Sequence, residues 1–185
     1  MREKIIEDIE QYTQKNKNED SEQFKVLIDI LKNDKKAFIR EEKESAIHLA
    51  SNMLLFNKDK SKLLCLWHKK IQAWTFPGGH CDGNENIEEV AHIELEEETG
   101  IKDIKVFSKS PLHIQRFDYN KNVYGYTKSI FGFFYATTVP DGQNPIIMEP
   151  DKCERIKWFS REEFGGLIEG DKYGINKFIF DKWPE

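Results

Sequence analysis

Apolar residues recur at helical spacing in the first 45 positions of the chain. They form two groups, with Ile5, Ile6 and Ile9 in the first and Phe24, Leu27, Ile28 and Leu31 in the second. The region has no Gly or Pro and is rich in residues that favour helices. We therefore predict two helices separated by the polar stretch 15–20, with Asp20 and Gln23 as a capping pair for the second helix.

The pattern changes at Ala46 to short apolar runs that are typical of strands. The runs cover residues 46–56, 62–68, 104–107, 112–117, 123–139 and 155–159, with turn-forming residues between them. The first two flank a turn at 57–61 and predict a hairpin. Helical patterns at 85–98, after the capping box Ser160–Glu163, and at 173–182 complete the chain. Strands with few helices between them indicate the α+β class, with a mixed or antiparallel sheet.

The chain length of 185 residues suits one ordinary domain with a small appendage. The helical, highly charged segment 1–45 differs in pattern from the strand-rich remainder. We therefore expect a helical N-terminal extension over 1–45 and a single domain over 46–185.

Composition limits the cellular setting and the classes of partner. The formal net charge is −5, so no general positive field favours nucleic-acid binding. No apolar run approaches the roughly 20 residues that span a bilayer, and the first residues lack the pattern of a signal peptide. The three cysteines are widely spaced and indicate neither a disulfide framework nor a thiolate zinc site. We expect a cytoplasmic protein that associates with no membrane.

The segment from Pro77 to Ile101 is unusually acidic. It contains eight Asp and Glu residues and neither Lys nor Arg, so its local charge is −8. On a helical wheel at about 100° per residue, Glu94, Glu97 and Glu98 lie on the same side as the apolar residues of this helix. Crowded acids that share the core side of a helix repel one another. Carboxylates without a basic partner suit Mg²⁺ or Mn²⁺, although a solvated acidic helix remains the alternative.

The residues that flank this helix support a binding site. Pro77, Gly78 and Gly79 form a turn at which the backbone can approach a ligand, so a glycine carbonyl could join a metal site. Gly100 supplies the left-handed residue that ends a helix, and Ile101 follows it.

Taken together, these residues resemble the Nudix box, G-x5-E-x7-R-E-U-x-E-E-x-G-U, in which U is apolar. Eight of the nine specified positions match, namely Gly79, Glu85, Glu94, Leu95, Glu97, Glu98, Gly100 and Ile101. The departure is Ile93, which stands where the family has Arg. The resemblance covers about residues 46–168, and the helical extension is similar to that of some bacterial, MutT-like members. It implies a mixed sheet sandwiched between helices.

The resemblance also implies an activity and roles for the residues. The activity is metal-dependent hydrolysis of the pyrophosphate bridge in a nucleoside diphosphate linked to another group, or in a nucleoside triphosphate. Glu94 and Glu98 would bind Mg²⁺ or Mn²⁺, Glu97 would be a third ligand or the general base, and the Gly79 carbonyl would complete the metal site. Glu85 would not bind the metal itself but would help to position the residues that do.

Because the family's Arg pairs with a carboxylate of the box, its replacement by Ile93 leaves that carboxylate without its usual partner. Another basic residue could take this position in space, with Lys128, Arg116 and Lys152 as candidates. Otherwise the helix relies on metal alone, and activity would be weak.

Three residues are candidates for substrate binding, and two of them, Trp74 and Glu149, also have an ordinary structural interpretation. Trp74 adjoins the glycine turn and could stack on a base, but aromatic residues at strand spacing are more often part of the core. Arg116 could contact phosphate. Glu149 lies in the segment 149–154, which is similar to a loop of some Nudix nucleoside triphosphate pyrophosphatases and could equally be a solvated turn.

Two classes of function remain open at this point. The chain could be an active Nudix hydrolase, or a Nudix-fold module that binds nucleotides and has lost activity together with the Arg. The three retained glutamates favour the enzyme. A small-molecule nucleotide is the expected partner, and a homodimer is possible.

Overall fold

The structure is a computed structural model that describes residues 2–17, 21–39, 47–119, 128–171 and 174–185. The predicted α+β class is confirmed, with N-terminal helices followed by a mixed sheet. The predicted boundary at residue 45 and the capping residue Asp20 lie outside the described residues. None of the helices in the described ranges is both long enough and apolar enough to cross a membrane.

Seven strands in the described residues form one sheet, with the order β3-β2-β1-β6-β5. In addition, β4 pairs with β1 and β7 pairs with β2. The strands are β1 (Ile47–Phe56), β2 (Lys62–His68), β3 (Ala73–Thr75), β4 (Gly78–His80), β5 (His113–Tyr119), β6 (Lys128–Thr138) and β7 (Cys153–Ser160). The helices are α1 (Arg2–Lys15), α2 (Ser21–Asn33), η1 (Lys35–Phe38), α3 (Ile87–Thr99), α5 (Arg161–Gly165) and α6 (Ile175–Asp181).

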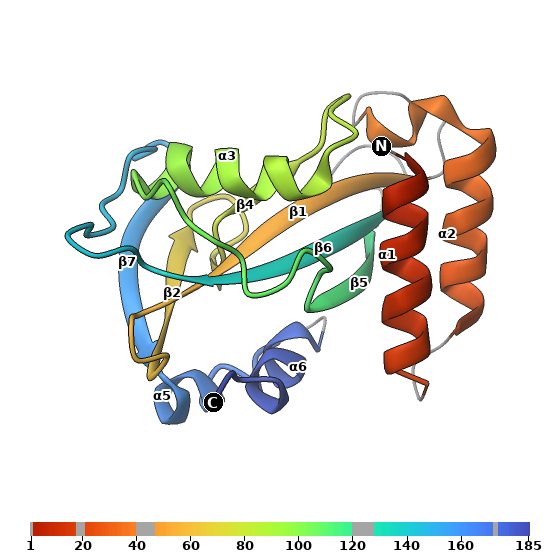
Figure 1. Ribbon diagram of the computed structural model, residues 1–185. Coiled ribbons are helices and arrows are strands. Elements are labelled where there is room, and N and C mark those ends of the chain that lie inside the picture. Colours follow the sequence, from red (N-terminus) through yellow and green to blue (C-terminus); the bar gives the residue numbers. More distant parts are fainter. Residues whose placement is uncertain (1, 18–20, 40–46, 120–127, 172–173) are drawn as a thin grey trace. The chain divides into compact units, whose positions relative to one another are not determined.

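The chain divides into two compact units, and each is described by itself. The first comprises Met1–Asn52, Gly79–Ala91 and Ser108–Tyr135. In this unit α1 and α2 lie side by side (Figure 1), and they bury five of the seven apolar positions that predicted them. The fully or nearly fully buried residues of the pair are Ile5, Ile9, Tyr12, Phe24, Leu27 and Leu31. Antiparallel pairing of β5 with β6 runs from His113 opposite Phe134 to Tyr119 opposite Lys128.

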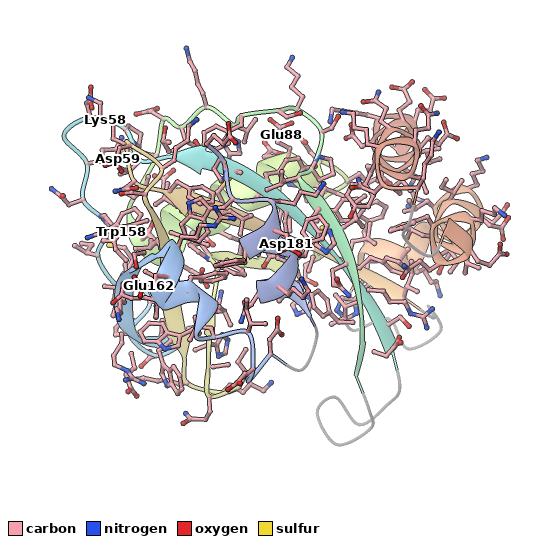
Figure 2. All side chains as sticks on the ribbon, turned by 90° about the horizontal axis from the view of Figure 1, so that it is seen from below. Lys58, Asp59, Glu88, Trp158, Glu162 and Asp181 are labelled. Atoms are coloured by element: carbon pink, nitrogen blue, oxygen red, sulfur yellow. The ribbon has the colours of Figure 1, made fainter. Side chains whose placement is uncertain are left out.

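The second unit comprises Met53–Gly78, His92–Phe107 and Ala136–Glu185. In this unit β2 and β7 form an antiparallel pair, in which Lys62 lies opposite Ser160. The predicted capping box is present, because Ser160 Oγ accepts from the Glu163 N–H while the Glu163 carboxylate accepts from the Ser160 N–H. The short helix α5 that follows packs against β7, and Figure 2 shows Trp158 and Glu162 on these two elements.

Four elements differ from the predictions. The helix predicted from residue 85 begins at Ile87, because Asn86 caps it by accepting from the Glu89 N–H. The strand predicted at 104–107 is absent apart from one bridge, Val106 to Thr137. The two three-residue strands β3 and β4 were not predicted, because runs of three residues give no readable alternation.

Candidate functional site

Helix α3 presents its apolar face to the core in the way the wheel predicts. Ile87, Val90, Ala91 and Leu95 are buried. Glu98 shares this side and is only 3% exposed, while Glu94 is half-buried. Glu97 differs from the prediction, since its side chain is exposed at the margin of the face. Two of the three candidate acids are therefore withdrawn from water, at a cost in free energy unless each has a partner.

The C-terminal end of α3 is fixed by the loop that precedes β7. Gly100 has the predicted left-handed conformation, with φ of 74°, and ends the helix. Beyond it, the N–H groups of Ile146 and Met148 donate to the carbonyls of Thr99 and Glu98 at 3.0 Å each. These bonds satisfy carbonyls that the helix cannot pair internally and hold the loop against the acidic residues.

Lys152 is the partner of the buried acids. Its Nζ lies 2.5 Å from Glu98 Oε1, 3.2 Å from Glu94 Oε2 and 3.5 Å from Glu149 Oε2. Three carboxylates, two from α3 and one from the loop before β7, thus gather around one positive charge. We refer to these four residues as the carboxylate cluster, and all of them belong to the second unit.

Backbone hydrogen bonds shape the turn that carries Lys152. The Glu149 carbonyl accepts from the N–H groups of both Lys152 and Cys153, at 3.1 and 2.9 Å. The Lys152 carbonyl in turn accepts from the Lys69 N–H, just after β2. Because the turn is held at both ends, Lys152 and Glu149 are directed to the same point.

Burial and charge act in opposite directions on the carboxylate cluster. Burial raises the pKa of Glu98 to about 7, although the Lys152 ammonium and the Gly78 N–H both lower it. Burial raises the pKa of Glu94 as well, by more than Lys152 lowers it. Burial alone would lower the pKa of Lys152, but the Glu98 carboxylate and its neighbours raise it above its usual value. Lys152 therefore carries a stable positive charge at neutral pH.

The glycine turn reaches the same carboxylates. The Gly78 N–H donates to Glu98 Oε2 at 3.0 Å, so each oxygen of Glu98 has a partner. Gly79, the candidate whose carbonyl could join a metal site, is the next residue in β4.

The carboxylate cluster offers oxygen donors of the kind that the predicted metal site requires. The donor set suits a hard divalent cation, because carboxylate oxygens from three residues already surround one cationic group. That group is the chain's own ammonium, however. Among the described residues, no three His, Cys, Asp or Glu side chains are placed to hold a metal ion as they stand. A divalent cation fits this site only when Lys152 moves away from Glu94 and Glu98.

Glu85 has a separate partner in the first unit. It precedes the helix and pairs with Arg2 of α1, whose Nε lies 2.7 Å from Glu85 Oε1. The Arg2 guanidinium also donates to the carbonyls of Leu31 and Asp34 and lies over the Phe38 ring. The N-terminal helices thus supply a basic partner to a residue of the box.

The remaining candidates lie in other surroundings. Trp74 is half-buried, with its ring centroid 5.0 Å from that of Phe159 and 5.5 Å from that of Trp67. Arg155 stacks over Trp67 and Trp74, at 4.4 and 5.3 Å from the ring centroids. Arg116 is exposed and pairs with Asp118 on its own strand. The Lys128 side chain lies outside the described residues.

Sequence reasoning proposed Lys152 as one of three replacements for the missing Arg, and the structure places it among the acids of the box. The same reasoning missed Arg2 and Arg155. Neither residue stands in a motif, and each reaches its partner through tertiary packing, so the sequence carries no spacing signal for them.

Residues 46–181 match the family model described as NUDIX domain. The chain belongs to the Nudix family. The match begins after the N-terminal helices α1 and α2 and includes the whole box and the carboxylate cluster.

Solved structures share this fold at low sequence identity. The Escherichia coli dihydroneopterin triphosphate pyrophosphohydrolase is 12% identical, with 73% of this chain and 93% of that chain covered and a TM-score of 0.58. A MutT protein from Methanosarcina mazei is 20% identical, with coverage of 73% and 91% and a TM-score of 0.53. An Ap4A hydrolase from Caenorhabditis elegans is 19% identical, with coverage of 72% and 93% and a TM-score of 0.51.

Family membership and the retained acids make the protein a Nudix pyrophosphohydrolase. Nudix hydrolases act on small nucleotide substrates and generally use divalent metals. The family therefore accounts for the unusual concentration of acids in α3.

Proposed function

We propose that the protein hydrolyses the pyrophosphate bridge of a nucleoside triphosphate, or of a nucleoside diphosphate linked to another group, with Mg²⁺ or Mn²⁺ as cofactor. The observation that supports this proposal is the convergence of Glu94, Glu98 and Glu149 on one cationic point. Carboxylates held in that way favour a hard cation and a bridging phosphate.

The residues of the box have distinct tasks in this proposal. Glu94 and Glu98 hold the cation, with the Gly79 carbonyl as a further ligand, and the Gly78 N–H fixes the orientation of Glu98. The bound cation neutralises phosphate oxygens and lowers the pKa of attacking water. Glu97 is exposed and lies one residue before Glu98, so it is available to accept a proton from that water, or to serve as a third ligand.

Glu149 and the aromatic group are proposed to bind the remainder of the substrate. Glu149 comes from the loop before β7, and its carboxylate lies beside the same Lys152 as the acids of α3. Trp74 offers a ring face for a base, and stacking on an aromatic ring is sequence-tolerant and worth about 1–3 kcal/mol per base. Arg116 is the candidate for a phosphate contact outside the cluster.

A panel of nucleotides tests the proposal directly. Purified protein with Mg²⁺ is incubated with nucleoside triphosphates, dinucleoside polyphosphates and nucleoside diphosphate sugars, and released phosphate and pyrophosphate are measured. We expect hydrolysis that EDTA abolishes. Turnover that survives EDTA would contradict the metal role, and no turnover on any member of the panel would favour a binding module instead.

We propose a cytoplasmic location and a small-molecule nucleotide as the partner, and a homodimer remains to be tested by light scattering. The N-terminal helices, which precede the family match, would support Glu85 of the box through Arg2.

A further inference from the structure

We propose that Lys152 is a tethered cation that occupies the carboxylate cluster in the metal-free enzyme and competes with the divalent ion for Glu94 and Glu98. This inference rests on the proposed cation dependence and adds a means of regulating it. The ammonium is attached to a flexible side chain, so it can leave the acids while the Lys152 backbone stays in place. This allows a divalent ion to replace it.

The contacts of Lys152 support this role. Its Nζ is within 3.5 Å of three carboxylates, and the shortest contact is with Glu98, the more deeply buried of the two acids of α3. A divalent ion would need the same oxygens of Glu94 and Glu98. Two cations cannot share these oxygens at close range, because their repulsion is strong where burial limits screening by water.

The competition has two consequences for the enzyme. Without metal, Lys152 offsets the repulsion among the acids and keeps them directed to one point. With metal, the ammonium is displaced and remains near the site, because the turn from Glu149 to Cys153 is held by backbone hydrogen bonds. The protein should therefore bind divalent ions more weakly than its carboxylates alone would allow.

The first test measures Mn²⁺ binding without substrate, by the electron paramagnetic resonance signal of the free ion. Lys152→Met keeps a flexible, unbranched side chain that is one atom shorter, and it removes the charge. We expect this variant to bind Mn²⁺ at least about 10-fold more tightly than the natural protein, a change equivalent to about 1.4 kcal/mol. Lys152→Arg keeps the charge and should retain the weaker binding.

Lys157→Met is the matched control. Lys157 lies on β7 in the same unit and pairs with Glu163 at 3.1 Å, so its loss changes the net charge equally without touching the cluster. Its Mn²⁺ affinity should equal that of the natural protein. If Lys152→Met binds no more tightly than Lys157→Met, the competition does not exist.

A second test uses the natural chain and does not depend on the folding of a variant. Acetic anhydride acetylates lysine side chains that have left their ion pairs. Mass spectrometry then measures the extent of acetylation at each lysine. Mg²⁺ should increase the modification of Lys152 several-fold and leave that of Lys157 unchanged. Constant modification of Lys152 at Mg²⁺ levels that saturate the protein would overturn the inference.

The two proposals fail in distinguishable ways. If the natural protein binds Mn²⁺ and hydrolyses nucleotides but Lys152→Met shows no gain in affinity, only the tethered cation is refuted. If neither protein binds Mn²⁺ and EDTA leaves hydrolysis unchanged, the cation dependence is refuted and this inference with it.

Discussion

Glu98 combines burial, a backbone partner and a charged partner in one side chain. Glu98→Gln keeps the shape and deletes the charge, so we expect the rate of nucleotide hydrolysis to fall at least ~10²-fold. Initial rates at saturating Mg²⁺ measure this change. Glu96→Gln, which alters an exposed acid on the outer side of the same helix, should leave the rate unchanged. A Glu98→Gln protein as active as the natural one would mean that the helix is merely acidic.

Ile93 stands at the position of the family's Arg, and its side chain is 43% exposed. Ile93 is therefore not a core residue. Ile93→Arg should therefore change the free energy of unfolding by no more than about 0.5 kcal/mol. We also expect unchanged turnover, because the side chain at position 93 is exposed whereas Glu98 is buried.

Thermal unfolding and initial rates of Ile93→Arg, measured together, test both expectations. A large loss of stability would show that position 93 is covered in solution. Raised turnover would show that the missing Arg limits the natural enzyme and that Lys152 does not take its place.

At the scale of elements, α1 is joined to the box through Arg2. The Arg2 guanidinium pairs with Glu85 and donates to two carbonyls at the C-terminal end of α2. Arg2→Met removes one donor from each of these partly buried groups and should reduce the free energy of unfolding by about 1–3 kcal/mol. Chemical denaturation measures this loss. Lys25→Met, which breaks an exposed pair with Glu22, is the control and should cost far less.

Several of these elements could be predicted from the sequence alone. The N-terminal helices, the hairpin of β1 and β2 and the capping box before α5 were predicted, because periodicity and caps are local properties. Apolar periodicity also placed Glu98 in the core. The run at 104–107 has residues typical of a strand but forms only a single β-bridge. Strand pairing depends on tertiary contacts, which a local pattern does not reveal.

The basic partners of the acids were the least predictable part of the site. Lys152 lies more than 50 residues beyond Glu98, and Arg2 more than 80 residues before Glu85. The excess of acid in the box indicates that a cation is needed, but only the fold determines which residue supplies it.

For the molecule as a whole, the crowded acids link stability to divalent ions. Mg²⁺ that binds the folded state alone should raise the melting temperature, by roughly 2–4 °C for each kcal/mol of stabilisation in a chain of about this size. The double variant Glu94→Gln, Glu98→Gln should lose this response and should be less stable without metal, because Lys152 loses two of its carboxylate partners. Differential scanning calorimetry with and without millimolar Mg²⁺ measures both effects. Equal shifts in the two proteins would place the bound ion elsewhere.

The loop that lies along the end of α3 gives the cluster a built-in reporter. The Ile146 and Met148 amides, which donate to the last carbonyls of α3, lie just before Glu149 in this loop. When this short ladder opens, those two amides can exchange with deuterium. The exchange rate of the Met148 amide therefore reports how often the loop leaves the end of α3, without substrate, metal or mutation.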